Sequence, residues 1–116
     1  MARVLVVDDE ALVRMNAVDM VEEAGHDTIE ATNADDAIRI LESRADIDCV
    51  FSDVGMPGSM DGLRLLQLVH ERWPTIHLIL ASGKDLPAGA TVPDDGVFLP
   101  KPYDYGDVTG ALARSA

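Results

Sequence analysis

The feature that most constrains this chain is an unbroken aliphatic run near its start, Val4 to Val7, followed by two aspartates. A strand with an apolar side chain at every position is buried on both faces, as in parallel sheets covered by helices on both sides. Four further segments have strand-like composition, and that at 26–32 is polar enough for a sheet edge. We predict strands at residues 3–9, 26–32, 48–53, 75–82 and 96–100.

Stretches with helical spacing separate these strands. Ala34, Ala37, Ile38 and Leu41 fall at i, i+3, i+4 and i+7, which is one face of a helix, and Asn33 before them is a favourable N-cap. Helices are expected at 11–24, from 34 through 41, from 61 to the Trp-Pro pair at 73–74, and over 103–114. Strands that alternate with helices predict an α/β doubly wound parallel sheet of five strands.

One segment interrupts the alternation. Residues 83–96 contain two prolines and three glycines where a fourth helix between strands is due. Proline and glycine disfavour a helix interior, so a short turn or an irregular loop is expected there.

Size and charge exclude several classes of protein. A chain of 116 residues fits one domain, and 21 acidic against 9 basic residues give a net charge of -12. Such a chain lacks the basic face that neutralises phosphates, which argues against a nucleic-acid partner. No apolar run approaches the roughly 20 residues that span a bilayer, and residues 1–7 are too short for a signal peptide. With Cys49 as its single cysteine, the chain is expected in the cytoplasm.

Polar side chains follow the predicted strands at the points where the strands end. They are Asp8 and Asp9 after the first, Asp53 at the third, Ser82 at the fourth and Lys101 after the fifth. The carboxyl ends of parallel strands form the ligand-binding edge of such sheets. Three carboxylates brought close together repel one another unless a cation lies between them, and oxygen ligands suit Mg²⁺. The pattern therefore favours a site for Mg²⁺ and phosphate.

The segments "VLVVDDE", "FSDVGMPGSMDG", "LILASG" and "FLPKPY", in this order and spacing, resemble the receiver domain of two-component response regulators. The resemblance covers residues 3 to about 113. It implies the flavodoxin-like fold with strand order 2-1-3-4-5, and a phosphoacceptor domain that catalyses only its own phosphorylation and dephosphorylation.

The resemblance also implies a role for each residue that matches the motifs. Asp53 would accept a phosphoryl group from a histidine kinase or a histidine phosphotransfer protein. Asp9 would bind Mg²⁺ directly, Asp8 mainly through water, and Gly55 through its backbone carbonyl.

Further residues would bind the phosphoryl group and report its presence. Lys101 would pair with a phosphoryl oxygen and Ser82 would donate a hydrogen bond to another. The side chain of Phe98 would rotate inward when the Ser82 hydroxyl moves toward the phosphoryl group. A protein target downstream would recognise the changed surface. The Lys101-Pro102 bond would be cis, although trans is the more frequent form of such bonds in general.

Some features depart from the usual receiver pattern. The turn between Pro57 and Asp61 is one residue longer than usual, which predicts a larger loop beside Asp53. The chain would be a single receiver domain over 1–116 without an output domain, stand-alone or excised from a longer protein. It resembles receivers encoded beside or fused to sensory histidine kinases.

Two alternatives remain open from the sequence. One is a pseudo-receiver, a binding module that never accepts phosphate. The other is a Mg²⁺-dependent phosphatase with a nucleophilic aspartate, although such enzymes carry an acid/base aspartate where this chain has Gly55.

Overall fold

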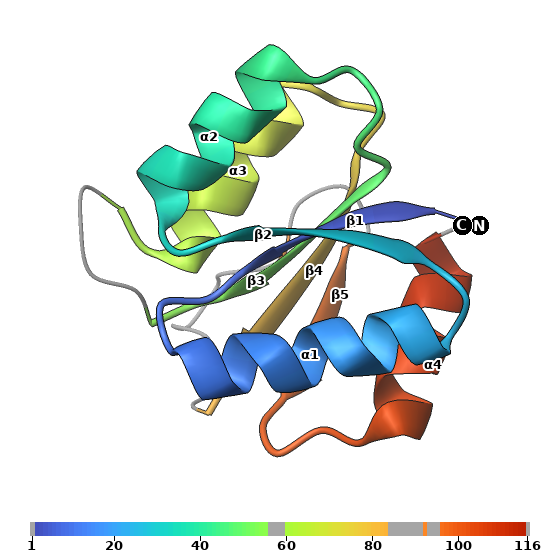
Figure 1. Cartoon of the computed structure of the whole chain (residues 1–116). Helices are drawn as coiled ribbons and strands as arrows, with labels where there is room; N and C mark the ends of the chain where they lie inside the picture. Colours follow the sequence, from blue (N-terminus) through green and yellow to red (C-terminus); the bar gives the residue numbers. More distant parts are fainter. Residues whose placement is uncertain (1, 56–59, 84–91, 93–95, 116) are drawn as a thin grey trace.

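The computed structural model describes residues 2–55, 60–83, 92 and 96–115. Five parallel strands form one sheet in the order β2-β1-β3-β4-β5 (Figure 1). The strands are β1 (Arg3–Val7), β2 (Asp27–Ala31), β3 (Cys49–Asp53), β4 (His77–Ser82) and β5 (Val97–Pro100). The predicted fold class and strand order are thus confirmed.

Four helices within the described residues cover the two faces of the sheet. They are α1 (Ala11–Glu23), α2 (Ala34–Ser43), α3 (Gly62–Arg72) and α4 (Tyr105–Ser115). Helices α1 and α4 pack on one face and α2 and α3 on the other, each over its own apolar cluster (Figure 1). Most of the segment 83–96, for which an irregular connection was predicted, lies outside the described residues, as do Gly58 and Ser59 of the loop beside Asp53.

The helix boundaries follow from local capping. Asn33 is the N-cap of α2, and its side-chain oxygen accepts a hydrogen bond from the backbone N–H of Asp36 at 2.8 Å. Asp61 caps α3 in the same way through the N–H of Arg64. Gly25, with a φ of 94°, lies beyond the end of α1, where the left-handed backbone favours glycine.

Some predicted boundaries were wrong. The first strand ends at Val7 rather than residue 9, because Asp8 and Asp9 belong to the turn that leads into α1. The fourth strand begins at His77 rather than residue 75, and the last helix at Tyr105 rather than residue 103. All three errors fall on one or two residues next to the end of an element, where composition does not separate the element from the turn beside it.

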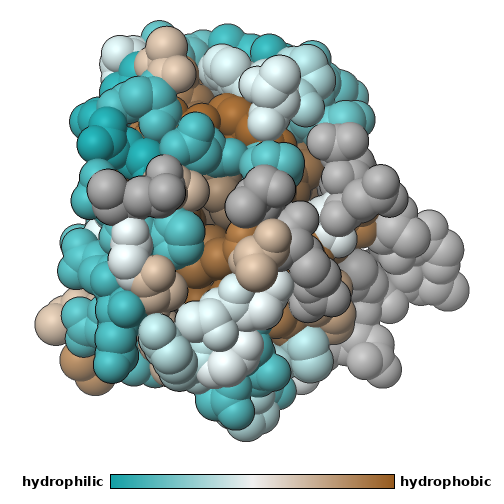
Figure 2. Space-filling model, turned by 90° about the vertical axis from the view of Figure 1, so that its right-hand side faces the viewer, coloured by the Kyte–Doolittle hydropathy of each residue, from teal (hydrophilic) through white to brown (hydrophobic). Residues whose placement is uncertain are grey.

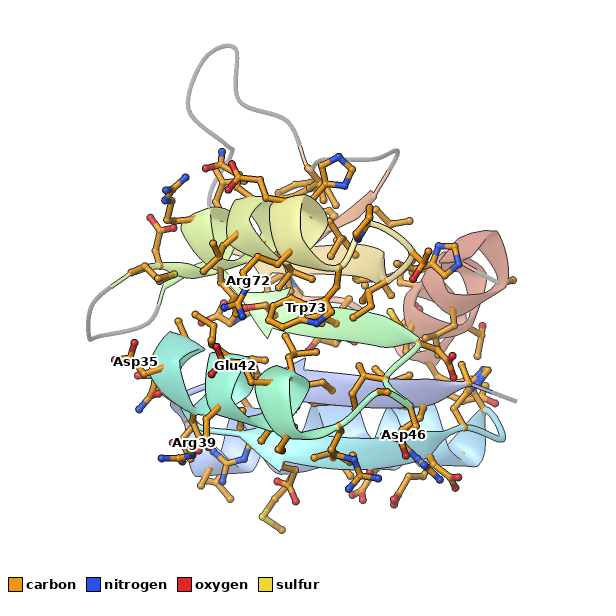
Figure 3. All side chains as sticks on the ribbon, turned by 90° about the horizontal axis from the view of Figure 1, so that it is seen from above. Asp35, Arg39, Glu42, Asp46, Arg72 and Trp73 are labelled. Carbon is orange, nitrogen blue, oxygen red and sulfur yellow. The ribbon has the colours of Figure 1, made fainter. Side chains whose placement is uncertain are left out.

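An arginine side chain connects the helices α2 and α3 at their carboxyl ends. The guanidinium of Arg72 contacts Glu42 of α2 at 2.9 Å and lies 4.3 Å from the centroid of the Trp73 ring (Figure 3). This contact closes the α2–α3 layer at the end of the sheet opposite the polar strand ends.

Candidate metal centre at the carboxyl end of the sheet

Three aspartates meet where β1 and β3 end. These strands are neighbours with Val7 paired to Ser52, so the turn after β1 lies beside Asp53. Asp8, Asp9 and Asp53 each offer a carboxylate oxygen, and these atoms all lie within 4.8 Å of one another. Asp8 and Asp53 are buried, whereas Asp9 is exposed. The expected convergence of the three carboxylates is confirmed.

The ammonium of Lys101 contacts this cluster directly. Its Nζ donates a hydrogen bond to Oδ1 of Asp53 at 2.7 Å, and the Asp53 side chain is only 10% exposed. The backbone N–H of Lys101 donates to the carbonyl of Ser82 at 2.8 Å, which fixes the residue after β5 to the end of β4. The Lys101-Pro102 bond is cis, as the resemblance implied.

The charges of the cluster do not balance. Among the residues that the structure describes, one ammonium faces three carboxylates, which leaves two negative charges. Burial raises the pKa of Asp8, and the charges of Asp53 and Asp9 add to the rise, against the hydrogen bond from the N–H of Glu10 and the charge of Lys101. A group of hard oxygen ligands with surplus negative charge fits a divalent cation such as Mg²⁺.

Gly55 borders the cluster from the loop after β3. A Cβ atom at this position would lie 3.9 Å from Oδ2 of Asp53, so residue 55 faces the carboxylate. The role of its backbone carbonyl as a metal ligand stays a prediction.

Two residues that hold Asp53 were not recognised in the sequence. The hydroxyl of Ser52 donates to the carbonyl of Asp53 at 2.9 Å. A Cβ atom on Gly62 would lie 1.9 Å from that carbonyl oxygen, so the start of α3 approaches β3 as closely as only glycine allows. The glycine was visible after Asp61, but the sequence indicated only a helix start.

Ser82 and Phe98, the residues of the predicted switch, lie in the neighbouring strands β4 and β5. Ser82 is the last residue of β4, buried, and paired across the sheet with Pro100 of β5. Phe98 in the middle of β5 is half-buried and packs against the apolar cluster under α2 and α3. Their movement on phosphorylation stays a prediction.

Tyr103 completes the side of the site that faces α1. Its ring packs against Phe51, with 5.7 Å between the ring centroids. Burial raises the pKa of Tyr103 to about 12, and the charges of Asp8 and Asp53 contribute. Tyr103 ends the "FLPKPY" segment, and its contact with Phe51 was not predicted from the sequence.

Comparison with known proteins agrees with this geometry. The response regulator receiver domain family matches residues 4–113. The sensor kinase CckA of Brucella abortus is 38% identical over 110 residues, which cover 88% of this chain and 11% of the kinase. The transcriptional regulator NtrC of Escherichia coli is 32% identical over 115 residues, or 97% of this chain and 24% of the regulator. The chain thus spans a quarter or less of the length of these relatives.

Solved structures match the fold over nearly the whole chain. The receiver domain of the hybrid histidine kinase CckA superposes with a TM-score of 0.80 at 31% identity and covers 97% of both chains. The response regulator TrrA of Thermotoga maritima, solved in complex with Mg²⁺ and BeF, has a TM-score of 0.88 at 22% identity over the full length of both chains.

The acidic cluster is typical of phosphoacceptor receivers and of their Mg²⁺ site. Such a domain is a phosphoacceptor module rather than a true enzyme. No helix in the described part of the chain has the length and apolar character needed to cross a membrane. With a family match that runs from β1 into α4, this chain belongs to the response regulator receiver domains of two-component signalling.

Proposed function

We propose that this domain accepts a phosphoryl group on Asp53 from a phosphohistidine, and that it signals through contact with another protein. The donor is a histidine kinase or a histidine phosphotransfer protein. The observation that carries the proposal is the contact of Asp53 with Lys101 inside the acidic cluster. Asp53 is the carboxylate that has an ammonium at 2.7 Å ready to receive the charge of an incoming phosphoryl group.

The proposed transfer needs one bond formed and one broken. A carboxylate oxygen of Asp53 attacks phosphorus, and the phosphorus–nitrogen bond of the donor breaks. The electron pair leaves with the imidazole, which takes up a proton, and an acyl phosphate remains on Asp53. Lys101 moves from the carboxylate to a phosphoryl oxygen and stabilises its charge.

The remaining residues of the cluster would hold the metal. Asp9 and the Gly55 carbonyl are proposed as direct protein ligands beside Asp53, and Asp8 as a ligand that acts mainly through water. Bound Mg²⁺ supplies positive charge that allows carboxylates and phosphoryl oxygens to approach one another.

Ser82 and Phe98 are proposed as the switch that reports phosphorylation. The Ser82 hydroxyl would move toward the new phosphoryl group and donate a hydrogen bond to it. The Phe98 side chain would then rotate into the space that the hydroxyl leaves. Phosphorylation would thereby change the surface around β5 that a downstream protein contacts.

The first turns of α1 support a protein as the phosphodonor. Leu12 and Met15 point away from the core with 81% and 55% of their surface exposed, although both are apolar. A hollow of about 520 Å³ lies beside them, lined by Leu12, Val13, Asn16, Lys101, Pro102 and Tyr103. An exposed apolar patch that adjoins the acceptor suits a partner that must bring its phosphohistidine to Asp53.

Phosphorylation by a small donor tests the chemistry. Incubation with acetyl phosphate and Mg²⁺ should add one phosphoryl group to the wild-type chain by intact mass. The Asp53→Asn variant should gain none. An unmodified wild type would favour the pseudo-receiver, and continuous release of phosphate over many turnovers would favour the phosphatase.

A second arm tests the docking patch. Leu12→Glu should slow phosphotransfer from the cognate kinase and leave the reaction with acetyl phosphate unchanged. Glu22→Gln on the same helix, farther from the site, is the matched control. Equal rates for wild type and Leu12→Glu with the kinase would exclude this patch as the docking surface.

A further inference from the structure

We propose that Arg14 is a positioning residue of the metal centre, which holds Asp8 in place through its main chain. Arg14 lies in α1, one turn after the two aspartates, and its side chain is only 15% exposed. Its Nη1 donates a hydrogen bond to the backbone carbonyl of Asp8 at 2.9 Å. Its Nε donates to Oε1 of Glu30 in β2 at 2.9 Å.

The guanidinium thus joins three elements at the carboxyl end of the sheet. It comes from α1, it contacts the residue that follows β1, and it is oriented by a carboxylate from β2. The planar, rigid arrangement of guanidinium donors suits two acceptors in fixed directions. Lysine, with a single nitrogen on a flexible stem, is a poor substitute for both bonds at once.

Asp8 needs such a restraint because it lies outside a strand. Its backbone N–H donates to the carbonyl of Ala31 at 3.1 Å, which continues the β1–β2 ladder by one bond. Its Oδ1 accepts a hydrogen bond from the N–H of Glu10 at 2.9 Å. The bond from Arg14 to the Asp8 carbonyl is the third restraint, and it comes from a side chain.

The opposing force is repulsion inside the cluster. Carboxylates of Asp8, Asp9 and Asp53 within 4.8 Å of one another favour a turn that opens away from β3. Arg14 opposes that opening at the main chain of Asp8, so that the carboxylates remain available as ligands. The cluster is then already assembled before the ion arrives, and less free energy is needed to form the site on binding.

This role predicts a specific loss of metal affinity. Residues that orient metal ligands, without touching the metal, typically change affinity by about 10-fold to 100-fold when they are substituted. Arg14→Met, which keeps the aliphatic stem, should therefore weaken Mg²⁺ binding by about 10-fold or more. Arg14→Lys should fall between this variant and the wild type.

The experiment is a Mg²⁺ titration followed by amide NMR shifts in the turn after β1. The matched control is Arg39→Met. Arg39 is an exposed residue of α2 (Figure 3), and it pairs with Asp36, which is not part of the cluster. The control should bind Mg²⁺ as the wild type does. Urea unfolding with a chelator, for each variant, separates loss of affinity from loss of the fold.

Glu30→Gln provides the second variant should Arg14→Met not fold. It removes the charge that orients the guanidinium and leaves Arg14 in place, so affinity should fall in the same direction by a smaller factor. Wild-type Mg²⁺ affinity in folded Arg14→Lys and Glu30→Gln, or in folded Arg14→Met, would overturn the role. The inference rests on the metal site of the proposed function. Because the titration uses no phosphodonor, it measures the role of Arg14 even if phosphoryl transfer fails.

Discussion

The aspartates at the two ends of the sheet differ in how many cationic side chains they contact. At the amino end, Arg3 of β1 contacts Asp27 at 3.2 Å and also contacts Asp46 before β3, while Arg44 contacts Asp46 at 2.8 Å. At the carboxyl end, three aspartates converge on one described ammonium, that of Lys101. Asp27 and Asp46 at the first end are paired with arginines of the chain itself, whereas the three aspartates at the second end share one ammonium.

The pKa values report the same difference. Hydrogen bonds from Arg44 and then Arg3 hold the pKa of Asp46 below its ordinary range. Burial raises the pKa of Asp8. The amino end is also the face seen in Figure 2, where hydrophilic residues surround hydrophobic ones. The comparison teaches that the surplus charge at the carboxyl end does not follow from the acidic composition alone, because Asp27 and Asp46 at the other end are paired with arginines.

Replacing the cation of each end should separate their roles most clearly. Lys101→Met should slow phosphorylation by acetyl phosphate by about 100-fold or more, because it removes the ammonium that stabilises the transferred charge. Arg3→Met at the amino end should leave that rate unchanged. The rate is measured by intact mass at fixed Mg²⁺. Equal slowing in both variants would contradict the division of roles.

The close approach of α3 to β3 predicts the next effect. Gly62→Ala should lower the free energy of unfolding by about 3 kcal/mol, because its Cβ would meet the Asp53 carbonyl at 1.9 Å. Gly110→Ala in α4, where a Cβ meets nothing within 4 Å, should instead stabilise by about 0.5–1 kcal/mol. Urea unfolding measures both. A Gly62→Ala variant as stable as the wild type would show that the strand end yields more easily than the structure indicates.

Replacing one aspartate at each end by asparagine should change the free energy of unfolding in opposite directions when no metal is bound. Asp8→Asn should raise the free energy of unfolding measured with a chelator, because it removes a buried charge repelled by its neighbours. Asp46→Asn should lower it, by an amount that shrinks as salt is added, because its partners are exposed. Both variants lowering stability equally would remove the contrast between the ends.

The smallest expected effect is a difference in pH dependence. The folded-state pKa of Asp46 is below its ordinary value of 3.8, so its contribution to stability is present above that pH and is lost as pH falls. The folded-state pKa of Asp8 is above 3.8, so its protonation favours the folded state at low pH, and this gain is lost as pH rises. Urea unfolding of the wild type, Asp8→Asn and Asp46→Asn, with a chelator, is compared from neutral pH to below pH 3.8, and each variant should lack the trend of the aspartate that it replaces. Parallel pH profiles would contradict them.

The sequence was sufficient to predict which residues converge at the carboxyl ends of the strands. Asp8, Asp9, Asp53 and Lys101 each follow an apolar run, and a parallel sheet brings the ends of such runs to one edge whatever the details of packing. The order of the strands came from the resemblance, since the pattern of apolar residues does not determine which strands are neighbours.

The residues that the sequence did not reveal act through contacts between distant elements. In the sequence, Arg14 is simply one polar position of a helix. Its contact with Glu30, 16 positions along the chain, appears only in the fold. In the sequence, Gly62 is simply part of a helix start. Its close approach to the carbonyl of Asp53 appears only in the fold. Leu12 reveals nothing unusual in the sequence, but the fold places it beside Lys101 in the hollow next to the acidic cluster.

The most direct test of the account is the urea midpoint of the wild-type chain as Mg²⁺ is raised at constant ionic strength. If the carboxyl end is short of positive charge, Mg²⁺ binds the folded state alone and the midpoint rises with the logarithm of its concentration above the dissociation constant. A midpoint that is the same in Mg²⁺ and in matched monovalent salt would contradict the claim that this end of the sheet is built for a divalent ion.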